Sequence, residues 1–223
     1  YSHLEKDLLK GLINETNNIQ IICPTPTRGI NKEIRKDFKK RKFENYDDKG
    51  KVRIRRFWAP REGKITIIRA FRYFWCNLRT YQIASKMQNV DLIFSNSTPP
   101  TQGILSILVS KKLSKARKKK IPFVYNLQDI FPDSLVSTRL TEKGSILWKI
   151  GRKIEDYTYK NADKIVVISD SFKRNIISKG VPVNKIEVIS NWIDLETTYP
   201  ISKNENKLID EFQIDSRKFL VVY

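Results

Sequence analysis

One stretch of the sequence, residues 121–134, places strong limits on the fold. It begins as an almost unbroken apolar run, which is typical of a strand buried on both faces of a parallel sheet. The run turns polar at Asn126 and places Gln128 and Asp129 just beyond the end of the predicted strand. Pro132 then opens a helical turn, because proline suits the first position of a helix and interrupts a strand. Ligands of open α/β sheets bind beyond the carboxyl ends of the strands, so this polar pair is the first candidate for chemistry.

The rest of the chain alternates apolar runs with amphipathic segments, and the connections between them are short. This order favours an α/β fold: a Rossmann-like parallel sheet with right-handed crossovers and helices on both faces. We expect strands over residues 19–23, 52–58, 90–94, 121–126, 164–169, 186–190 and 219–223, the second of them a candidate edge strand. We expect helices over residues 65–87, 101–112, 145–159, 170–180 and 203–212, and a long loop over residues 24–50.

A further helix opens the chain, where Ser2 and Glu5 form a capping box ahead of a leucine stripe. A doubly wound sheet normally places a strand before its first helix, so we expect that strand to precede this sequence. Ser2 and His3 would then lie near the ligand cleft, at a helix N-terminus that favours anions. An ordinary capped helix with a stray histidine explains the same residues, and both interpretations stay open.

The net charge of +19 is unevenly distributed. Residues 111–120 hold seven Lys/Arg and no acid, and residues 28–42 hold eight against two acids, whereas residues 187–215 carry seven acids against two lysines. One basic face is therefore expected, with nucleic acid, acidic lipid or a phosphorylated substrate as its partner. The residues assigned to an anionic membrane surface are Arg69, Arg72, Lys111, Lys112, Lys115, Arg117 and Lys118.

The predicted helix over residues 65–87 has two interpretations. Its apolar stripe consists of Ile67, Phe71, Phe74, Leu78 and Tyr81, and arginines lie on another stripe. Aromatic side chains beside arginines are typical of a helix that lies on a membrane surface. The same stripe is also what a helix packed on a core presents, with its arginines facing water.

Several classes of protein are excluded by what the sequence lacks. Cys23, Cys76 and the single histidine are too few for a disulfide framework or a zinc site, which indicates a reducing, cytoplasmic compartment and no metal. No apolar run is long enough to span a membrane, and no signal peptide is visible. There is no G-x-G pair and no G-x-S-x-G elbow; Gly63-Lys64-Ile65-Thr66 is no P-loop, because Trp58 stands where the first glycine is required.

What remains is a set of polar loops at successive strand ends, over residues 95–100, 128–134, 169–171 and 191–194. Because the strands are parallel, these loops are expected at one edge of the sheet. Asp129 and Gln128 are the catalytic candidates, and Asn96, Ser97, Thr98, Ser169, Asn191 and Trp192 are the candidates for substrate binding. Each of these residue types also serves in turns and helix caps, and Asp129 in particular can cap the turn before Pro132.

Three of these segments carry a resemblance to a known family. They are Gln128-Asp129-x-x-Pro132-Asp133-Ser134, Val166-Val167-Ile168-Ser169-Asp170-Ser171 and Val188-Ile189-Ser190-Asn191-Trp192-Ile193-Asp194. Together they resemble the bacterial retaining glycosyltransferases of family 4, which have the GT-B fold, and especially the N-acetylfucosaminyl-transferase-like proteins of surface-polysaccharide assembly. The resemblance covers residues 90–194. Gln128 stands where many relatives have histidine, and Trp192 replaces a commoner glycine.

The resemblance implies that residues 1–200 form the acceptor-side domain, and residues 201–223 a linker and the first strand of a carboxyl-terminal domain. That second domain would bind the nucleotide-sugar donor through an E-x7-E motif outside this sequence, so the isolated fragment would be inactive. The implied reaction is retaining transfer to a lipid-linked saccharide of capsule or O-antigen synthesis, by a peripheral protein on the inner face of the plasma membrane. No cofactor is implied besides the donor substrate.

Two other functions remain as alternatives. A basic nucleic-acid-binding domain is suggested by the charge alone; it lacks any named module, so nucleic acid is not an expected partner. A non-catalytic α/β domain that binds a ligand would share the same fold and loops.

Overall fold

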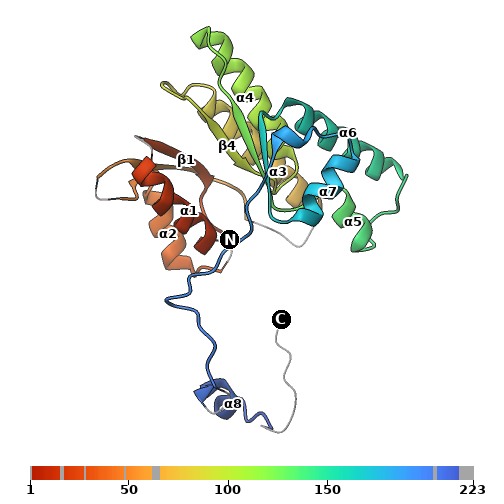
Figure 1. Cartoon of the computed structure of the whole chain (residues 1–223). Helices are drawn as coiled ribbons and strands as arrows, with labels where there is room; N and C mark the ends of the chain where they lie inside the picture. Colours follow the sequence, from red (N-terminus) through yellow and green to blue (C-terminus); the bar gives the residue numbers. More distant parts are fainter. Residues whose placement is uncertain are drawn as a thin grey trace.

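The computed structural model describes residues 2–15, 18–27, 29–47, 49–61, 66–202 and 205–215. The helices are α1 (Ser2–Glu15), α2 (Lys32–Lys40), α3 (Thr66–Ala84), α4 (Thr101–Arg117), α5 (Asp133–Ser137), α6 (Ile146–Asn161), α7 (Asp170–Ser178), α8 (Lys207–Glu211) and a 3-10 turn, η1 (Val183–Lys185). The strands are β1 (Ile19–Pro24), β2 (Phe43–Asn45), β3 (Val52–Phe57), β4 (Ile93–Asn96), β5 (Phe123–Leu127), β6 (Lys164–Val167) and β7 (Ile186–Val188). They form two sheets, with the orders β1-β3-β2 and β4-β5-β6-β7 (Figure 1).

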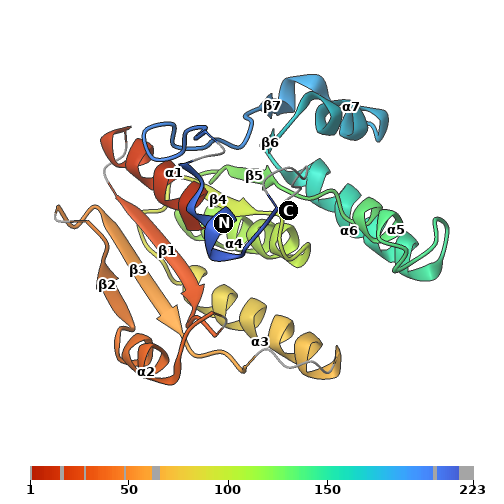
Figure 2. The ribbon, with the colours of Figure 1, turned by 90° about the horizontal axis from the view of Figure 1, so that it is seen from below.

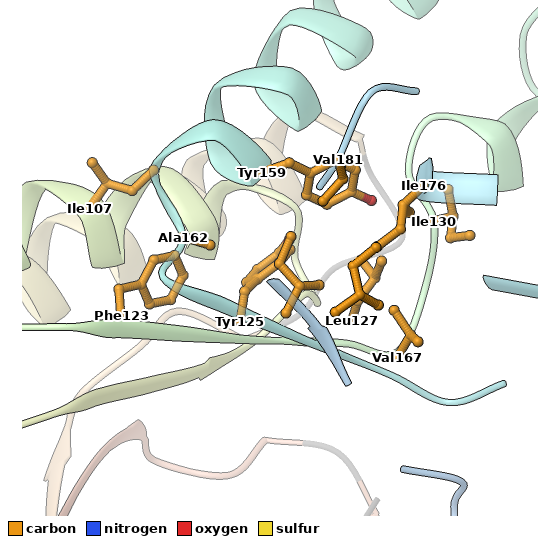
Figure 3. Packing of buried hydrophobic residues seen from close by; sticks show 12 residues of the cluster. Ile107, Phe123, Tyr125, Leu127, Ile130, Tyr159, Ala162, Val167, Ile176 and Val181 are labelled. Atoms are coloured by element: carbon orange, nitrogen blue, oxygen red, sulfur yellow. The ribbon is translucent and has the colours of Figure 1, made fainter. Parts of the chain in front are cut away.

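The four-stranded sheet confirms the predicted α/β class, because all of its neighbouring strands are parallel and helices flank it. Its central strand β5 alternates strictly: Phe123, Tyr125 and Leu127 are buried, while Val124 and Asn126 on the opposite face are half-buried. Figure 3 shows Phe123, Tyr125 and Leu127 packed beneath three helices. Of these helices, α4 contributes Ile107, α6 contributes Tyr159 and α7 contributes Ile176 to the same cluster. This packing holds the carboxyl end of β5, and therefore the loop that carries Asp129, against three helices.

The three-stranded sheet corrects two expectations. Residues 19–23 were expected to join the same sheet as the other strands, but β1 pairs in parallel with β3, and neither belongs to the four-stranded sheet. The predicted edge strand over residues 52–58 is the central strand, because β3 also pairs with β2 in an antiparallel hairpin. The hairpin turn is held by Asp47, whose carboxylate accepts hydrogen bonds from the backbone of Lys51 and Val52.

The long loop expected over residues 24–50 is also wrong, because it contains α2 and β2. Asn31 caps α2 by accepting a hydrogen bond from the backbone N–H of Ile34 at 2.8 Å. Ile34 and Phe38 lie four residues apart, so they share a face of the helix. Basic residues surround these two apolar side chains, so the sequence of the segment shows no clear helical period.

Most other boundaries moved by a few residues. The helix expected over residues 101–112 continues to Arg117, so four of the seven basic residues in the segment 111–120 are helical. Lys118 is the C-cap residue, with φ 52°. The strand expected over residues 90–94 begins at Ile93, and the helix expected over residues 203–212 covers Lys207–Glu211. The predicted strand over residues 219–223 lies outside the described residues. Beyond β7 the chain leaves the sheet as an exposed segment and runs toward α8 (Figure 1).

For α3 the structure tests whether its apolar stripe packs on the core. Phe71, Phe74 and Leu78 are exposed, so this part of the stripe is not buried in the core. The last turns of α3 pack inward, where Tyr81 and Ala84 lie against α4 and Ile83 is buried. The side chain of Ile67 lies outside the described residues.

Candidate functional site

The loops that follow β4 and β5 are joined by one buried hydroxyl. Ser97, with 3% of its surface exposed, accepts hydrogen bonds through Oγ from the backbone N–H groups of Gln128 (3.0 Å) and Asp129 (3.2 Å). Its own backbone N–H donates to the carbonyl of Asn126 at 2.9 Å. Ser97 thus extends the pairing of β4 with β5 by one residue and fixes the backbone on which Asp129 stands. Its role in the structure is to position that loop.

The carboxylate of Asp129 is exposed at the carboxyl edge of the sheet, the edge at which the parallel strands end. Its Oδ2 accepts a hydrogen bond from the hydroxyl of Ser134 at 3.1 Å. Among the described contacts, no backbone N–H donates to this carboxylate, and Pro132, the N-cap residue of α5, offers no side-chain cap. The carboxylate therefore does not cap the turn, and its Oδ1 has no protein donor among those contacts.

A directed chain of amides crosses this edge from β5 to α1. Gln128 Nε2 donates to Asn126 Oδ1 (3.1 Å), and Asn126 Nδ2 donates to Asn96 Oδ1 (2.8 Å). Asn96 Nδ2 in turn donates to the carboxylate of Glu5 at 3.3 Å. Asn126 and Asn96 each donate one hydrogen bond and accept another, so the orientation of both amides is determined by their neighbours. The loops predicted after β4 and β5 are thereby brought together.

Two residues of this hydrogen-bonded chain of side chains, Asn126 and Glu5, were not predicted as site residues. Asn126 was noted only as the point where the apolar run turns polar, although a polar residue in a buried strand needs a partner. Glu5 was assigned to a capping box with Ser2, but α1 begins at Ser2 and Glu5 reaches Asn96 instead. The side chains of Ser2 and His3 lie outside the described residues. Glu5 nevertheless shows that the first turn of α1 meets the candidate site.

The other predicted site residues lie farther along the sheet edge or serve local structure. Ser169 caps α7, accepting a hydrogen bond from the backbone N–H of Phe172, and its hydroxyl pairs with that of Ser171. Asn191 and Trp192 follow β7, two strands from β5, and are exposed. Thr98 is exposed beside Ser97. None of the described contacts joins these four residues to Asp129.

Behind the Asp129 loop lies a buried ion network that the sequence did not reveal. Lys179, with 11% of its side chain exposed, pairs with Asp133 of α5 at 2.7 Å and with Glu155 of α6 at 2.8 Å. Arg152 pairs with Glu155 and Asp156, so α5, α6 and the end of α7 are tied together. Asp133 stands only four residues after Asp129. The network therefore holds the far side of the loop that carries the candidate carboxylate.

The two carboxyl groups that Lys179 joins, buried Glu155 and half-buried Asp133, respond differently to this environment. Burial raises the pKa of Glu155, and the neighbouring Lys179 and Arg152 offset only part of that effect. For Asp133 burial acts in the same direction, but hydrogen bonds from Lys179 and Asn175 outweigh it and lower the pKa. Burial also raises the pKa of Tyr125 and Tyr159, which lie near Glu155, so both phenols are neutral at ordinary pH. The charges nearest Asp129 on this side are therefore paired within the network.

Close packing completes the support. Gly151 of α6 lies against the loop, where a Cβ would meet Pro132 at 2.7 Å and Phe131 at 2.9 Å. A small cavity of about 10 Å³ is lined by residues of the loop, among them Asp129 and Phe131, and by Ile154 and Glu155 of α6. The loop therefore rests directly on α6, and only a side chain as small as glycine's permits this approach.

The basic residues predicted for an anionic surface come from two helices. Arg72 of α3 donates to the carbonyl of Pro60, whereas Lys111 of α4 contacts Tyr157 of α6. Arg117 is turned toward the carbonyl of Val90 and the carboxylate of Asp91. Arg69, Lys112, Lys115 and Lys118 are exposed. The seven charges are divided between α3 and the far end of α4.

Two other features are absent from the described part of the chain. No group of three or more His, Cys, Asp or Glu residues there is placed to hold a metal ion. No helix there combines the length and apolar character that crossing a bilayer requires.

Taken together, a parallel sheet, covering helices and polar loops at the carboxyl edge define a Rossmann-like α/β domain, a class of fold in which ligands bind at that edge. The family model of Glycosyltransferase Family 4 matches residues 6–197, and the chain therefore belongs to that family.

Individual relatives are more distant. The "Probable glycosyltransferase WbjE" of Pseudomonas aeruginosa is 24% identical over 156 residues, covering 69% of this chain and 38% of that protein. Among solved structures, the crystal structure of Anabaena HepE in complex with UDP-glucose matches with a TM-score of 0.44 and 16% identity, covering 79% of this chain and 39% of HepE. The complex with UDP has a TM-score of 0.46 and 13% identity, covering 88% and 50%. The chain thus spans half or less of the length of these relatives.

Proposed function

We propose that this chain forms the acceptor side of a retaining glycosyltransferase that moves a sugar from a nucleotide-sugar to a lipid-linked saccharide in surface-polysaccharide synthesis. Membership of Glycosyltransferase Family 4 supports the reaction class. The observation that carries the site is the exposed carboxylate of Asp129, whose backbone is fixed by Ser97 and whose Oδ2 is held by Ser134. Residues 1–200 make up this half, and the donor is held by a further domain to which residues 201–223 lead.

Asp129 acts in this proposal as an orienting and charge-stabilising group. Retention places the acceptor hydroxyl on the same side of the sugar as the leaving phosphate, and that phosphate takes the hydroxyl proton. The protein then has to align the hydroxyl and stabilise the charge that develops at the anomeric carbon. The open Oδ1 of Asp129 is available for a hydrogen bond from a sugar hydroxyl.

Gln128 has a different part. An amide neither gains nor loses a proton at ordinary pH, so Gln128 carries no proton transfer. Its Nε2 begins the amide chain through Asn126 and Asn96, which leaves its Oε1 to accept from a bound hydroxyl. Asn191 and Trp192, which follow β7 on the same edge, are assigned to the more distant parts of the substrates.

An anionic membrane surface is the partner that a lipid-linked acceptor requires. Such an acceptor is held in the bilayer by its polyprenyl chain and carries a diphosphate, and a chain of net charge +19 is attracted to both. The protein is accordingly assigned to the cytoplasmic face of the membrane as a peripheral protein.

The experiment is Asp129→Asn in the intact protein. The substitution removes the charge and keeps the volume, and we expect transfer to fall on the order of 10²-fold or more while the fold is unchanged. Transfer from radiolabelled UDP- and GDP-sugars to extracted lipid-linked saccharides measures the rate, and NMR of the product reports whether the anomeric configuration is retained.

Asp91→Asn is the matched control, because that carboxylate is exposed beside Arg117, away from the carboxyl edge. A thermal melt should move little for either variant. Turnover by Asp129→Asn at the rate of the control would reduce Asp129 to a structural residue and remove the proposed site.

A further inference from the structure

The outer face of α3 is unusual because large apolar side chains are exposed along it. Ile68, Phe71, Phe74 and Leu78 have exposed fractions of 41%, 54%, 64% and 37%. Their spacing of three or four residues places all four on one side of the helix. Figure 2 shows α3 along the side of the molecule opposite α7, where its outer face meets no other element.

The first half of α3 contacts the rest of the chain only sparsely. Asn77, in the middle of the helix, donates to Thr101 at the start of α4, and only the turns after it pack on α4. Before that point the described contacts of α3 are those of Arg72 with Pro60 and of Trp75 with Trp58. Trp58 is itself 54% exposed, and its ring meets that of Trp75 edge to face at 5.8 Å. The aromatic surface therefore extends beyond the helix.

The same face continues into a basic hollow at the end of α3. The hollow has a volume of about 430 Å³ and is lined by Arg55 of β3 together with Arg79, Gln82, Ile83 and Lys86. Gln82 follows Leu78 by four residues, so it continues the line of the apolar stripe, and Lys86 lies in the turn just beyond the end of the helix. The hollow thus lies at one end of the exposed aromatic surface.

The cations of this hollow lack acidic partners within the described part of the chain. Arg55 lies over the ring of Phe43 at 5.2 Å, and Arg79 lies 6.0 Å from the ring of Trp75 and donates to Gln82 at 2.7 Å. No ion pair there includes Arg55, Arg79 or Lys86, and residues 66–84 contain no acid. Three cations around one hollow, two of them arginines, are suited to a phosphate group.

We infer that this face of α3 docks on a bilayer that contains anionic phospholipid. The apolar stripe enters the interface between headgroups and acyl chains, and the hollow of Arg55, Arg79 and Lys86 takes a headgroup phosphate. A helix with aromatic residues beside arginines and without acids has the composition of an interfacial helix. A second copy of this chain is a poor occupant, because two faces with these cations repel each other at close range.

This inference deepens the proposed function by naming the surface that meets the membrane, and its test needs no sugar transfer. A failed transfer assay leaves the vesicle measurement intact, and failed vesicle binding leaves the Asp129 experiment intact. The surface also differs from the end of α4, so matched variants separate specific docking from general attraction of a positive protein.

The experiment measures how the intact protein partitions onto phosphatidylcholine vesicles with and without about 30 mol% phosphatidylglycerol, at fixed ionic strength. Arg55→Gln, Arg79→Gln and Lys86→Gln combined should weaken binding to the anionic vesicles on the order of 10²-fold, because each near-surface cation contributes about fivefold. Lys112→Gln, Lys115→Gln and Lys118→Gln combined remove the same charge from α4, and we expect a loss below about tenfold. An equal loss from both triples overturns the docking site in favour of diffuse attraction.

The apolar stripe of α3 is tested with two double variants, one on the stripe and one elsewhere as a control. Phe71→Ser with Phe74→Ser should lower binding to the anionic vesicles by about tenfold or more, since two exposed rings no longer enter the interface. Leu140→Ser with Phe212→Ser changes two side chains that are 72% and 67% exposed elsewhere, and should leave binding unchanged. Self-association of the wild type in sedimentation, abolished by the phenylalanine variant while vesicle binding persists, would make this face a protein interface and overturn the inference.

Discussion

At the scale of single residues, Asn126 and Asn96 show how much of the site depends on orientation rather than on charge. The two amides pair across β4 and β5 on the face opposite the main core, and the pair continues to Gln128 and Glu5. Asn126 and Asn96 each have one partner for the amide N–H and another for the amide oxygen. A change at either residue therefore leaves groups on two neighbours unpaired. The chain therefore couples the loop after β5 to the first turn of α1.

Asn126→Asp tests this coupling. The carboxylate still accepts from Gln128 Nε2, but it cannot donate to Asn96 Oδ1, so two acceptors face each other in a half-buried place. We expect the free energy of unfolding to fall by about 1–3 kcal/mol. Asn31→Asp is the control, because at that helix cap only the side-chain oxygen is used and aspartate caps as well as asparagine. Equal stability of the two variants in urea denaturation would contradict the amide chain.

At the scale of the elements, the contact between α6 and the Asp129 loop predicts how the protein responds when Gly151 is replaced. Gly151→Ala should destabilise the protein by about 1–3 kcal/mol, because the added Cβ meets Pro132 and Phe131 well inside contact distance. Gly11→Ala in α1 meets nothing within 4 Å and should stabilise the protein by about 0.5–1 kcal/mol through helix propensity alone. Thermal melts of both variants measure the contrast. Two stabilising substitutions would show that α6 does not support the loop.

The ion network of Lys179 makes a prediction that depends on pH. Lys179→Met leaves Glu155 and Asp133 without their shared cation, and we expect a loss of about 3–5 kcal/mol of stability at neutral pH. The pKa of Asp133 is lowered in the folded protein, so its contribution is present above the ordinary aspartate pKa and is lost as pH falls below that value. The variant raises the pKa of Glu155 further, since burial then acts without Lys179, and protonation relieves the unpaired charge.

Urea denaturation at neutral pH and near pH 4 should therefore show a smaller difference between wild type and Lys179→Met at the acid pH, close to the ordinary carboxyl pKa of about 4. Lys164→Met is the control, because Lys164 and Glu187 are 47% and 57% exposed and their pair contributes little. A difference that is the same at both pH values would show that the buried carboxyls do not depend on Lys179.

At the scale of the whole molecule, the sequence predicted the four-stranded sheet better than the rest. The apolar run around Phe123 identified the central strand β5, although only one face of that strand is fully buried, and parallel strands bring their ends to one edge. The sequence-based prediction failed where basic residues obscured the apolar pattern. In α2, Ile34 and Phe38 lie among lysines, so the helix was not predicted. β3 carries arginines and was therefore expected at an edge, although it pairs with a strand on each side.

The candidate site was predictable in its position and not in its contacts. Asp129, Asn96 and Ser97 were found because polar residues after buried strands are easily recognised. Lys179 and Gly151 lie far from Asp129 in sequence, and no local pattern links a lysine at a helix end or a glycine in a helix to a particular loop. Their roles follow from the packing of α6 and α7, which only the folded chain shows.

The distribution of charge over the whole molecule separates the membrane proposal from nucleic-acid binding. The cations at the end of α4 act at long range on any polyanion, and their attraction is screened by salt. The face of α3 adds apolar surface, which salt does not screen and duplex DNA does not accommodate. We therefore expect the intact protein to bind both phosphatidylglycerol vesicles and a short duplex DNA at about 0.1 M salt, where the Debye length is about 10 Å.

Raising the salt to about 1 M, where the Debye length is about 3 Å, should abolish DNA binding and leave a measurable part of the vesicle binding. That remaining part should disappear in the variant with Phe71→Ser and Phe74→Ser, whose charge is unchanged. Flotation of vesicles and fluorescence anisotropy of labelled DNA measure the two affinities under the same conditions. If DNA binding outlasted vesicle binding as the salt rises, the basic surface would belong to a nucleic-acid-binding protein, because only contacts beyond phosphate attraction survive such screening.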